Sequence, residues 1–106
     1  MDNPNNIRKH DRIQMEIVSA CRDIGIEAIQ EYSGQGWRSD VFVPNNGNPI
    51  AFEIQLSPQS LLRTIERQSK YTGDGIIGCW LFENPVPKLN EERPDLPVFY
   101  WSFLIN

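Results

Sequence analysis

The chain has 106 residues, of which 40% are hydrophobic and 23% are charged, and its net charge at pH 7 is −4. This composition is typical of one globular domain, residues 1–106, and argues against a disordered chain or a membrane protein. The excess of acidic residues also excludes a surface that attracts nucleic acid everywhere, so any basic surface must be local. The polar N-terminal stretch lacks the apolar run of a signal peptide, and a cytoplasmic location is expected.

The first predicted element is an amphipathic helix over residues 8–23, and Gly25 supplies its stop. Residues 26–32 then alternate between apolar and polar, which predicts a strand, and the Ser-Gly-Gln-Gly cluster at 33–36 predicts a turn. The apolar stripe of the helix consists of Ile13, Ile17, Val18, Cys21 and Ile24.

Two further strands are predicted over residues 37–43 and 50–56, which are rich in aromatic and β-branched residues. The segment between them combines Pro, Asn and Gly and is typical of a tight turn. Because the connection is so short, the two strands are expected to be antiparallel neighbours.

A second helix is predicted from the Ser57-Pro58 pair, with Ser57 as N-cap and Pro58 at the first helical position, to Gly73. Residues 76–82 form a nearly continuous apolar run, which favours a strand buried on both faces beside a parallel partner. A proline-rich irregular connection follows over 84–97.

The aromatic segment 98–105 is too hydrophobic to remain in water, so it is expected to add a strand, cover a helix face or form an interface. The predicted fold is therefore α/β (α+β), in the order α-β-β-β-α-β, with a mixed central sheet flanked by helices and an extra C-terminal strand.

The third strand contains a conflict between polarity and burial. Glu53 lies in the centre of a strongly hydrophobic strand, on the face opposite to Phe52 and Ile54. Burying a carboxylate without a partner is costly, so Glu53 requires a cation or a hydrogen-bond donor.

Asp40 is a second acid, on the neighbouring strand, and two carboxylates at one place would repel each other. A divalent cation would relieve that repulsion, and Mg²⁺ is usually held by one or two carboxylates together with waters and phosphate oxygens. Such an ion lowers the pKa of a bound water and stabilises charge on a scissile phosphate, so the pair favours phosphate chemistry.

The succession of Asp40, a strand-turn-strand, Glu53-Ile54-Gln55 and a helix bearing Arg63, Arg67 and Tyr71 resembles the motif of the PD-(D/E)XK nuclease superfamily. More specifically, the string Arg38-Ser39-Asp40-Val41, followed by Ile50-Ala51-Phe52-Glu53-Ile54-Gln55-Leu56-Ser57, is similar to the nuclease-like domain of the competence protein CoiA family.

This resemblance implies a restriction-endonuclease-like core with Asp40 and Glu53 as metal ligands and the backbone carbonyl of Ile54 as a further ligand. It places Gln55 where most members have lysine, and it implies a contribution from Glu16, since in several members a glutamate on the first helix faces the metal. Glutamine supplies hydrogen bonds without positive charge, so Arg38 or Arg63 is expected to provide the missing cation.

The second predicted helix also carries a local basic face. Arg63, Arg67 and Lys70 recur at helical spacing and suit phosphate binding, with Tyr71 available to stack or to pack. The alternative is a solvated helix face in which Glu66 pairs with Lys70.

Other residues are better explained by packing than by catalysis. Both cysteines, Cys21 and Cys79, are expected to be reduced core residues, and the only histidine, His10, is expected at the surface. The tryptophans Trp37, Trp80 and Trp101 are assigned to the core or to an interface.

The sequence thus predicts a Mg²⁺- or Mn²⁺-dependent deoxyribonuclease that acts on DNA, with Asp40, Glu53, Gln55 and Glu16 as catalytic residues and Arg38, Arg63, Arg67 and Tyr71 as nucleic-acid contacts. The alternative is a non-catalytic module that keeps the nuclease fold to bind a protein or nucleic-acid partner. A homodimer, or a subunit or fragment of a larger nuclease, is a third hypothesis.

Overall fold

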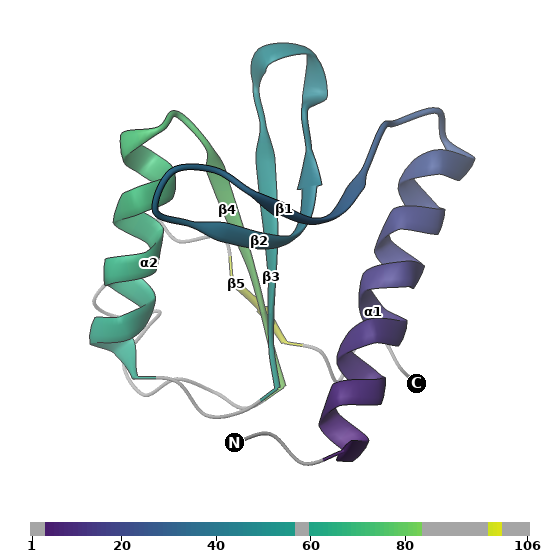
Figure 1. The fold of residues 1–106 in the computed structure, drawn as a ribbon, viewed down its shortest axis with the longest axis horizontal. Coiled ribbons are helices and arrows are strands. Elements are labelled where there is room, and N and C mark those ends of the chain that lie inside the picture. The colour runs from purple at the N-terminus through teal and green to yellow at the C-terminus, as the bar shows by residue number, and fades with distance from the viewer. Residues whose placement is uncertain (1–3, 57–59, 84–97, 101–106) are drawn as a thin grey trace.

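The computed structural model describes residues 4–56, 60–83 and 98–100 and has a mixed α+β fold, as predicted (Figure 1). One helix precedes three strands, and a second helix precedes two more. The elements are α1 (Pro4–Asp23), β1 (Ile29–Ser33), β2 (Arg38–Val43), η1 (Asn45–Gly47), β3 (Ile50–Gln55), α2 (Leu61–Gly73), β4 (Ile77–Phe82) and β5 (Val98–Tyr100).

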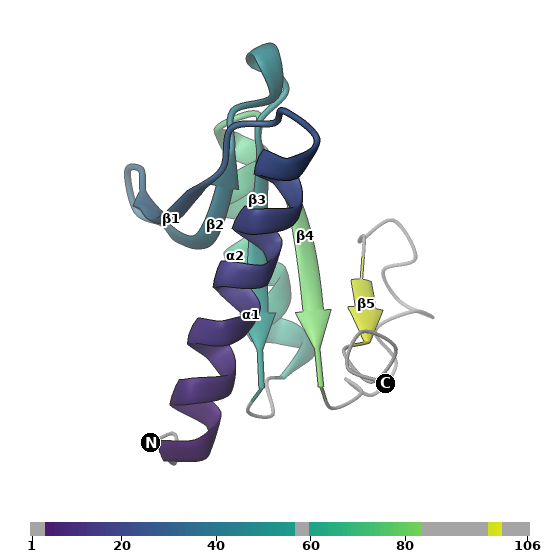
Figure 2. The same cartoon turned by 90° about the vertical axis from the view of Figure 1, so that its right-hand side faces the viewer.

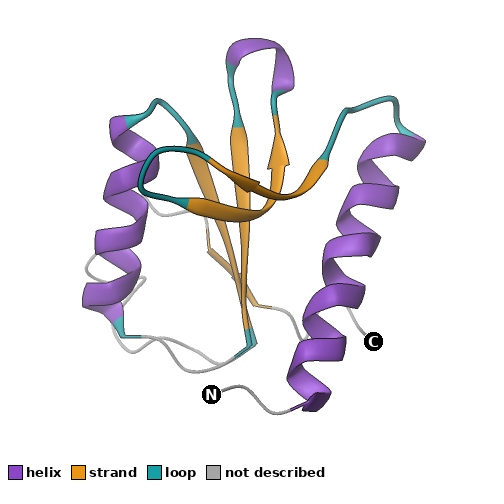
Figure 3. Cartoon of the chain, in the orientation of Figure 1, coloured by secondary structure: helices purple, strands orange, loops and turns teal. Residues whose placement is uncertain are grey.

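The strands form one sheet in the order β1-β2-β3-β4-β5. The β1–β2 and β2–β3 pairs are antiparallel, whereas the β3–β4 and β4–β5 pairs are parallel, so the sheet is mixed as expected. The two helices lie on opposite faces of this sheet, as Figures 1 and 2 show from perpendicular directions. The β2–β3 connection projects beyond the sheet and carries η1 at its tip (Figure 3).

The alternation of side chains along β3 builds two cores, one on each face of the sheet. Ile54 and Leu56 pack with Ile13 of α1, whereas Ala51 packs with Tyr71 of α2. The predicted division of β3 into an apolar face and a face that contains Glu53 is therefore confirmed. Strand β4 lies between parallel neighbours and is buried on both faces over residues 80–82, where Trp80 packs with Tyr71 and Leu81 with Ile13. Ile77 at its start is instead 51% exposed.

Helix α1 ends as the sequence predicts. Gly25 adopts φ +78, and the Ile26 N–H donates to the Cys21 carbonyl at 2.8 Å, which is the Schellman arrangement. Ile24, which was placed on the apolar stripe, is instead 73% exposed, because it follows the last helical residue, Asp23. Ile13 and Val18 are buried, as expected.

The predicted start of α2 was wrong. Ser60 is the N-cap, and its hydroxyl oxygen accepts a hydrogen bond from the Arg63 N–H at 3.1 Å. Ser60 lies three residues after the predicted cap Ser57, and the helix uses Ser60. Ser57 and Pro58 lie outside the described residues. The predicted end at Gly73 is confirmed.

The extra C-terminal strand is confirmed over Val98–Tyr100, where β5 pairs with β4. The predicted irregular connection over 84–97 and the rest of the aromatic segment, including Trp101, lie outside the described residues. Among the helices of the part that the structure describes, none combines the length and the apolar character needed to cross a membrane.

Candidate active site

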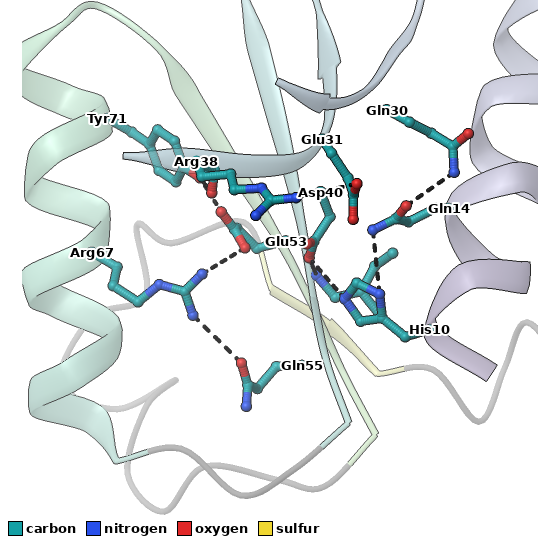
Figure 4. Close-up of polar contacts among 11 residues, drawn as sticks. His10, Gln14, Gln30, Glu31, Arg38, Asp40, Glu53, Gln55, Arg67 and Tyr71 are labelled. Atoms are coloured by element: carbon teal, nitrogen blue, oxygen red, sulfur yellow. Dashed lines mark hydrogen bonds and ion pairs between the residues drawn. The ribbon is translucent and has the colours of Figure 1, made fainter. Parts of the chain in front are cut away.

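Asp40 and Glu53 are the next residues on β2 and β3 after the last aligned pair of the β2–β3 ladder. This ladder pairs Val43 with Ile50 and Val41 with Phe52. Beyond that last pair the Asp40 carboxylate enters the hydrogen bonding, because its Oδ2 accepts the Ile54 N–H at 2.7 Å. The two acids thus belong to one cluster between α1 and α2, which Figure 4 shows in close-up.

Glu53 is 2% exposed, and helix α2 supplies the partners that its burial requires. Arg67 donates from Nη2 to Glu53 Oε2 at 2.6 Å, and the Tyr71 hydroxyl donates to Oε1 (Figure 4). Arg67 and Tyr71 are four residues apart, so they lie on the same face of α2. The predicted need of Glu53 for a cation or a donor is therefore met by side chains of the protein.

Burial and, to a lesser extent, the charge of Asp40 nevertheless raise the pKa of Glu53 from its usual 4.5 to about 7. Arg67 and Tyr71 oppose this shift without cancelling it. Burial and the charge of Glu53 also raise the pKa of the Tyr71 hydroxyl, which therefore remains a proton donor. Near neutral pH the Glu53 carboxyl is therefore only partly ionised, because its two donors do not fully offset its burial.

Asp40 has a second partner that the sequence did not reveal. His10 of α1 places Nε2 at 3.3 Å from Asp40 Oδ2, the same oxygen that accepts the Ile54 N–H. The hydrogen bond with Asp40 raises the pKa of His10. The side chain of His10 is 28% exposed, so His10 lies at the surface as expected but is partly buried and has an acidic partner.

Glu16, the predicted α1 contributor, is not brought to this cluster. Its side chain is 58% exposed and lies 3.9 Å from the Arg12 guanidinium. Among the α1 side chains that the structure describes, His10 contacts Asp40 and Gln14 contacts His10, and both lie within one turn of the buried Ile13. Their spacing along the apolar stripe was a signal in the sequence, since side chains four residues apart share one face of a helix.

Gln55 lies on the same face of β3 as Glu53, and its Oε1 accepts a weak hydrogen bond from Arg67 at 3.4 Å. Arg67 thus brings a positive charge into contact with Gln55, whereas the sequence had suggested Arg38 or Arg63 for this role. Ile54 reaches the cluster through its main chain, by its N–H to Asp40. The role of its carbonyl as a metal ligand stays a prediction.

A basic pocket of about 230 Å³ opens between the β1–β2 turn and α2. Arg63 and Lys70 form no ion pair among the described residues, and the Glu66–Lys70 pair considered as an alternative is not observed there. Arg38 lies 3.2 Å from Glu31, and Arg67 stacks over Trp80 with its guanidinium carbon 5.0 Å from the ring centroid. The lining residues are Gly36, Trp37, Arg38, Arg63, Arg67, Lys70 and Tyr71.

The remaining candidates have structural roles. Trp80 is fully buried and donates from Nε1 to Gln68 at 2.8 Å, and Trp37 packs against the same core. Cys21 and Cys79 are free and half-buried, and burial raises the pKa of the Cys79 thiol to about 11. Both cysteines therefore fit the prediction of reduced packing residues.

The donor set suits a hard cation with few protein ligands. No group of three or more His, Cys, Asp or Glu side chains is positioned to hold a metal ion within residues 4–56, 60–83 and 98–100. Two carboxylates and a backbone carbonyl are oxygen donors, which Mg²⁺ and Mn²⁺ accept together with waters and phosphate oxygens. A cation between Glu53 and Asp40 would favour the ionised form of Glu53, which its burial and the charge of Asp40 disfavour.

Comparisons with known proteins show the fold and the family of this chain. The chain is 28% identical over 86 residues to the human protein C8orf44, and the match covers 66% of this chain and 54% of the human protein. It also resembles a crystal structure described as a protein of unknown function, AF1548, with a TM-score of 0.64 and 13% identity over 89% of this chain and 59% of that one, which shows a shared fold. The chain spans little more than half the length of either protein.

The family model of the competence protein CoiA nuclease-like domain matches residues 8–106, which include both helices from Arg8 onward, the whole sheet and the carboxylate cluster. The chain therefore belongs to the CoiA nuclease-like domain family.

Proposed function

We propose that this domain is a Mg²⁺- or Mn²⁺-dependent nuclease of the PD-(D/E)XK superfamily, with a restriction-endonuclease-like core, that hydrolyses phosphodiester bonds of DNA. The observation that carries the proposal is the position of Arg67. This side chain lines the basic pocket and at the same time contacts Glu53, so a phosphate-binding surface adjoins the carboxylate cluster. The nuclease-like character of the family supports the same activity.

The pocket binds the phosphates of the substrate. Arg63 and Lys70 are exposed, and no carboxylate among the described residues pairs with them, so their charges are available to an anion. They lie seven residues apart on α2, or about 10 Å along the helix axis, so the two cations are far enough apart to contact different phosphates. The basic face is local, as the net charge of −4 requires.

Asp40, Glu53 and the carbonyl of Ile54 would hold the metal ion, which when bound supplies a Lewis acid for the phosphate and lowers the pKa of a bound water. Gln55 orients the attacking water through its amide. Arg67 supplies near Gln55 the positive charge that lysine gives in other members. Tyr71 keeps its proton and holds Glu53 in place.

The test is DNA cleavage by the wild type and by Asp40→Asn and Glu53→Gln. Linear, circular and single-stranded DNA are incubated with Mg²⁺, with Mn²⁺ and with EDTA, and Mn²⁺ binding is measured by calorimetry. Both substitutions preserve side-chain volume while removing a metal-binding charge. Glu66→Gln, an exposed glutamate on α2, is the matched control.

We expect metal-dependent cleavage by the wild type and the control and its loss in both site variants. Cleavage that survives both substitutions would refute the assignment of Asp40 and Glu53. A wild type that neither cuts any substrate nor binds Mn²⁺ would overturn the nuclease proposal and leave the non-catalytic binding module.

A further inference from the structure

Asp40 is held through one of its two oxygens. Its Oδ2 accepts the Ile54 N–H at 2.7 Å and faces His10 Nε2 at 3.3 Å, so one donor comes from β3 and the other from α1. The other oxygen, Oδ1, has no hydrogen-bond or ion-pair partner among the described residues. The carboxylate is therefore fixed at one end and available to a ligand at the other.

A chain of amides orients the His10 ring. Gln14, which is 2% exposed, lies one helical turn after His10 and places Nε2 at 3.3 Å from His10 Nδ1. The opposite end of the same amide, Gln14 Oε1, accepts a hydrogen bond from Gln30 of β1 at 3.0 Å. Figure 4 shows this line of side chains from Gln30 through Gln14 and His10 to Asp40.

The direction of these hydrogen bonds determines which ring nitrogen of His10 donates. Because Gln30 donates to Gln14 Oε1, the NH₂ group of Gln14 points at His10 Nδ1, which must then accept. The proton of the neutral ring therefore lies on Nε2, which donates to Asp40. A protonated ring also carries a hydrogen on Nε2, so the contact with Asp40 does not depend on the charge of His10.

We infer that His10 is a positioning residue for the metal site, which acts through Asp40 and is held in place by Gln14 and Gln30. It holds Oδ2 and leaves Oδ1 available, so that less entropy would be lost when Asp40 binds a metal ion. Hydrogen-bonded partners of this kind typically contribute about 10–100-fold to metal affinity. The inference rests on the proposed function, because it requires Asp40 to be a ligand.

The experiment compares Mn²⁺ dissociation constants by calorimetry for the wild type and for His10→Ala, His10→Gln and Gln14→Met. Glutamine at position 10 restores an N–H at about the distance of Nε2, and methionine at position 14 keeps the buried volume while removing the amide that holds the ring. Met15→Gln, on the exposed side of α1, is the matched control. Thermal unfolding of each variant, without metal, reports its stability separately.

We expect His10→Ala to weaken Mn²⁺ binding about 10–100-fold, His10→Gln to recover most of the affinity, and Gln14→Met to give a smaller loss. The control should bind as the wild type does. If His10→Ala lowers the melting temperature but leaves the dissociation constant unchanged, or if His10→Gln recovers nothing, the inference is overturned and the proposed function survives. If the wild type does not bind Mn²⁺, or Asp40→Asn binds it equally well, the metal site itself fails, and the inference with it.

Discussion

Replacing Glu53 by glutamine removes a buried charge and should change how the stability of the domain depends on pH. The side chain of Glu53 is 3% exposed, and its carboxyl pKa rises on folding from 4.5 to about 7. Between these two values the folded protein binds a proton that the unfolded chain releases, so the free energy of unfolding falls as pH rises.

The size of the effect follows from the linkage relation. Each pH unit in this window costs about 1.4 kcal/mol, and the shift from 4.5 to about 7 corresponds to about 3 kcal/mol in total. The contribution is fully present below pH 4.5 and is lost as pH rises through 7. The wild type should therefore lose about 3 kcal/mol relative to Glu53→Gln between pH 4.5 and pH 8.

The assay is urea unfolding of both proteins at half-unit pH intervals, without added divalent cations. Because His10 and the other titratable groups are present in both proteins, the difference between the two curves reports Glu53 together with its coupling to Asp40, Arg67 and Tyr71. Glu66→Gln, on the exposed side of α2, controls for the general effect of removing a carboxylate. A wild-type-minus-variant difference that is flat with pH, or that grows in favour of the wild type, would refute the argument that burial dominates at Glu53.

Three further outcomes are expected. Arg63→Ala should weaken DNA binding, as measured by fluorescence anisotropy. The slope of log affinity against log salt concentration should become shallower by about 0.7 for single-stranded DNA or about 0.9 for duplex DNA. An unchanged slope would show that Arg63 does not contact phosphate. Gln68→Leu should destabilise the fold by about 1–3 kcal/mol in urea unfolding, because it leaves the buried Trp80 N–H without its acceptor, and a neutral effect would contradict this. Ser60→Ala should cost about 1 kcal/mol through loss of the α2 N-cap, whereas Ser69→Ala, in the exposed middle of the helix, should cost less; equal losses would argue against the cap.

The sequence predicted best where one local rule decides the structure. The alternation along β3 assigned Glu53 and Ile54 to opposite faces because successive side chains in a strand must alternate. Gly25 marked the end of α1 because a positive φ favours glycine. The burial conflict at Glu53 likewise predicted that it needs a partner, because the cost of a buried charge is general.

The sequence predicted less where tertiary docking decides. Arg67 and Tyr71 were expected to contact nucleic acid, and their contacts with Glu53 depend on how α2 packs across the sheet. His10 was assigned to the surface because it lies in a polar segment; its spacing from Ile13 placed it beside the apolar stripe, but only the docking of α1 brings it to Asp40. The start of α2 was misplaced because Ser57 and Ser60 meet the same local criterion for an N-cap.

Helix α2 explains how an acidic domain can present a basic pocket beside an acidic cluster. Its buried face contributes Thr64, Gln68 and Tyr71 to the interior, and its outer face contributes Arg63 and Lys70 to the pocket. Arg67 lies between these faces, with its side chain 25% exposed, and contacts both Glu53 and the pocket. Because one helix carries all of these groups, its packing on the sheet sets the position of the phosphate-binding cations relative to the carboxylates. A displacement of α2 would therefore move the pocket and remove the neutralising partners of Glu53 together, so the candidate substrate surface and the candidate catalytic cluster depend on the same helix–sheet contact.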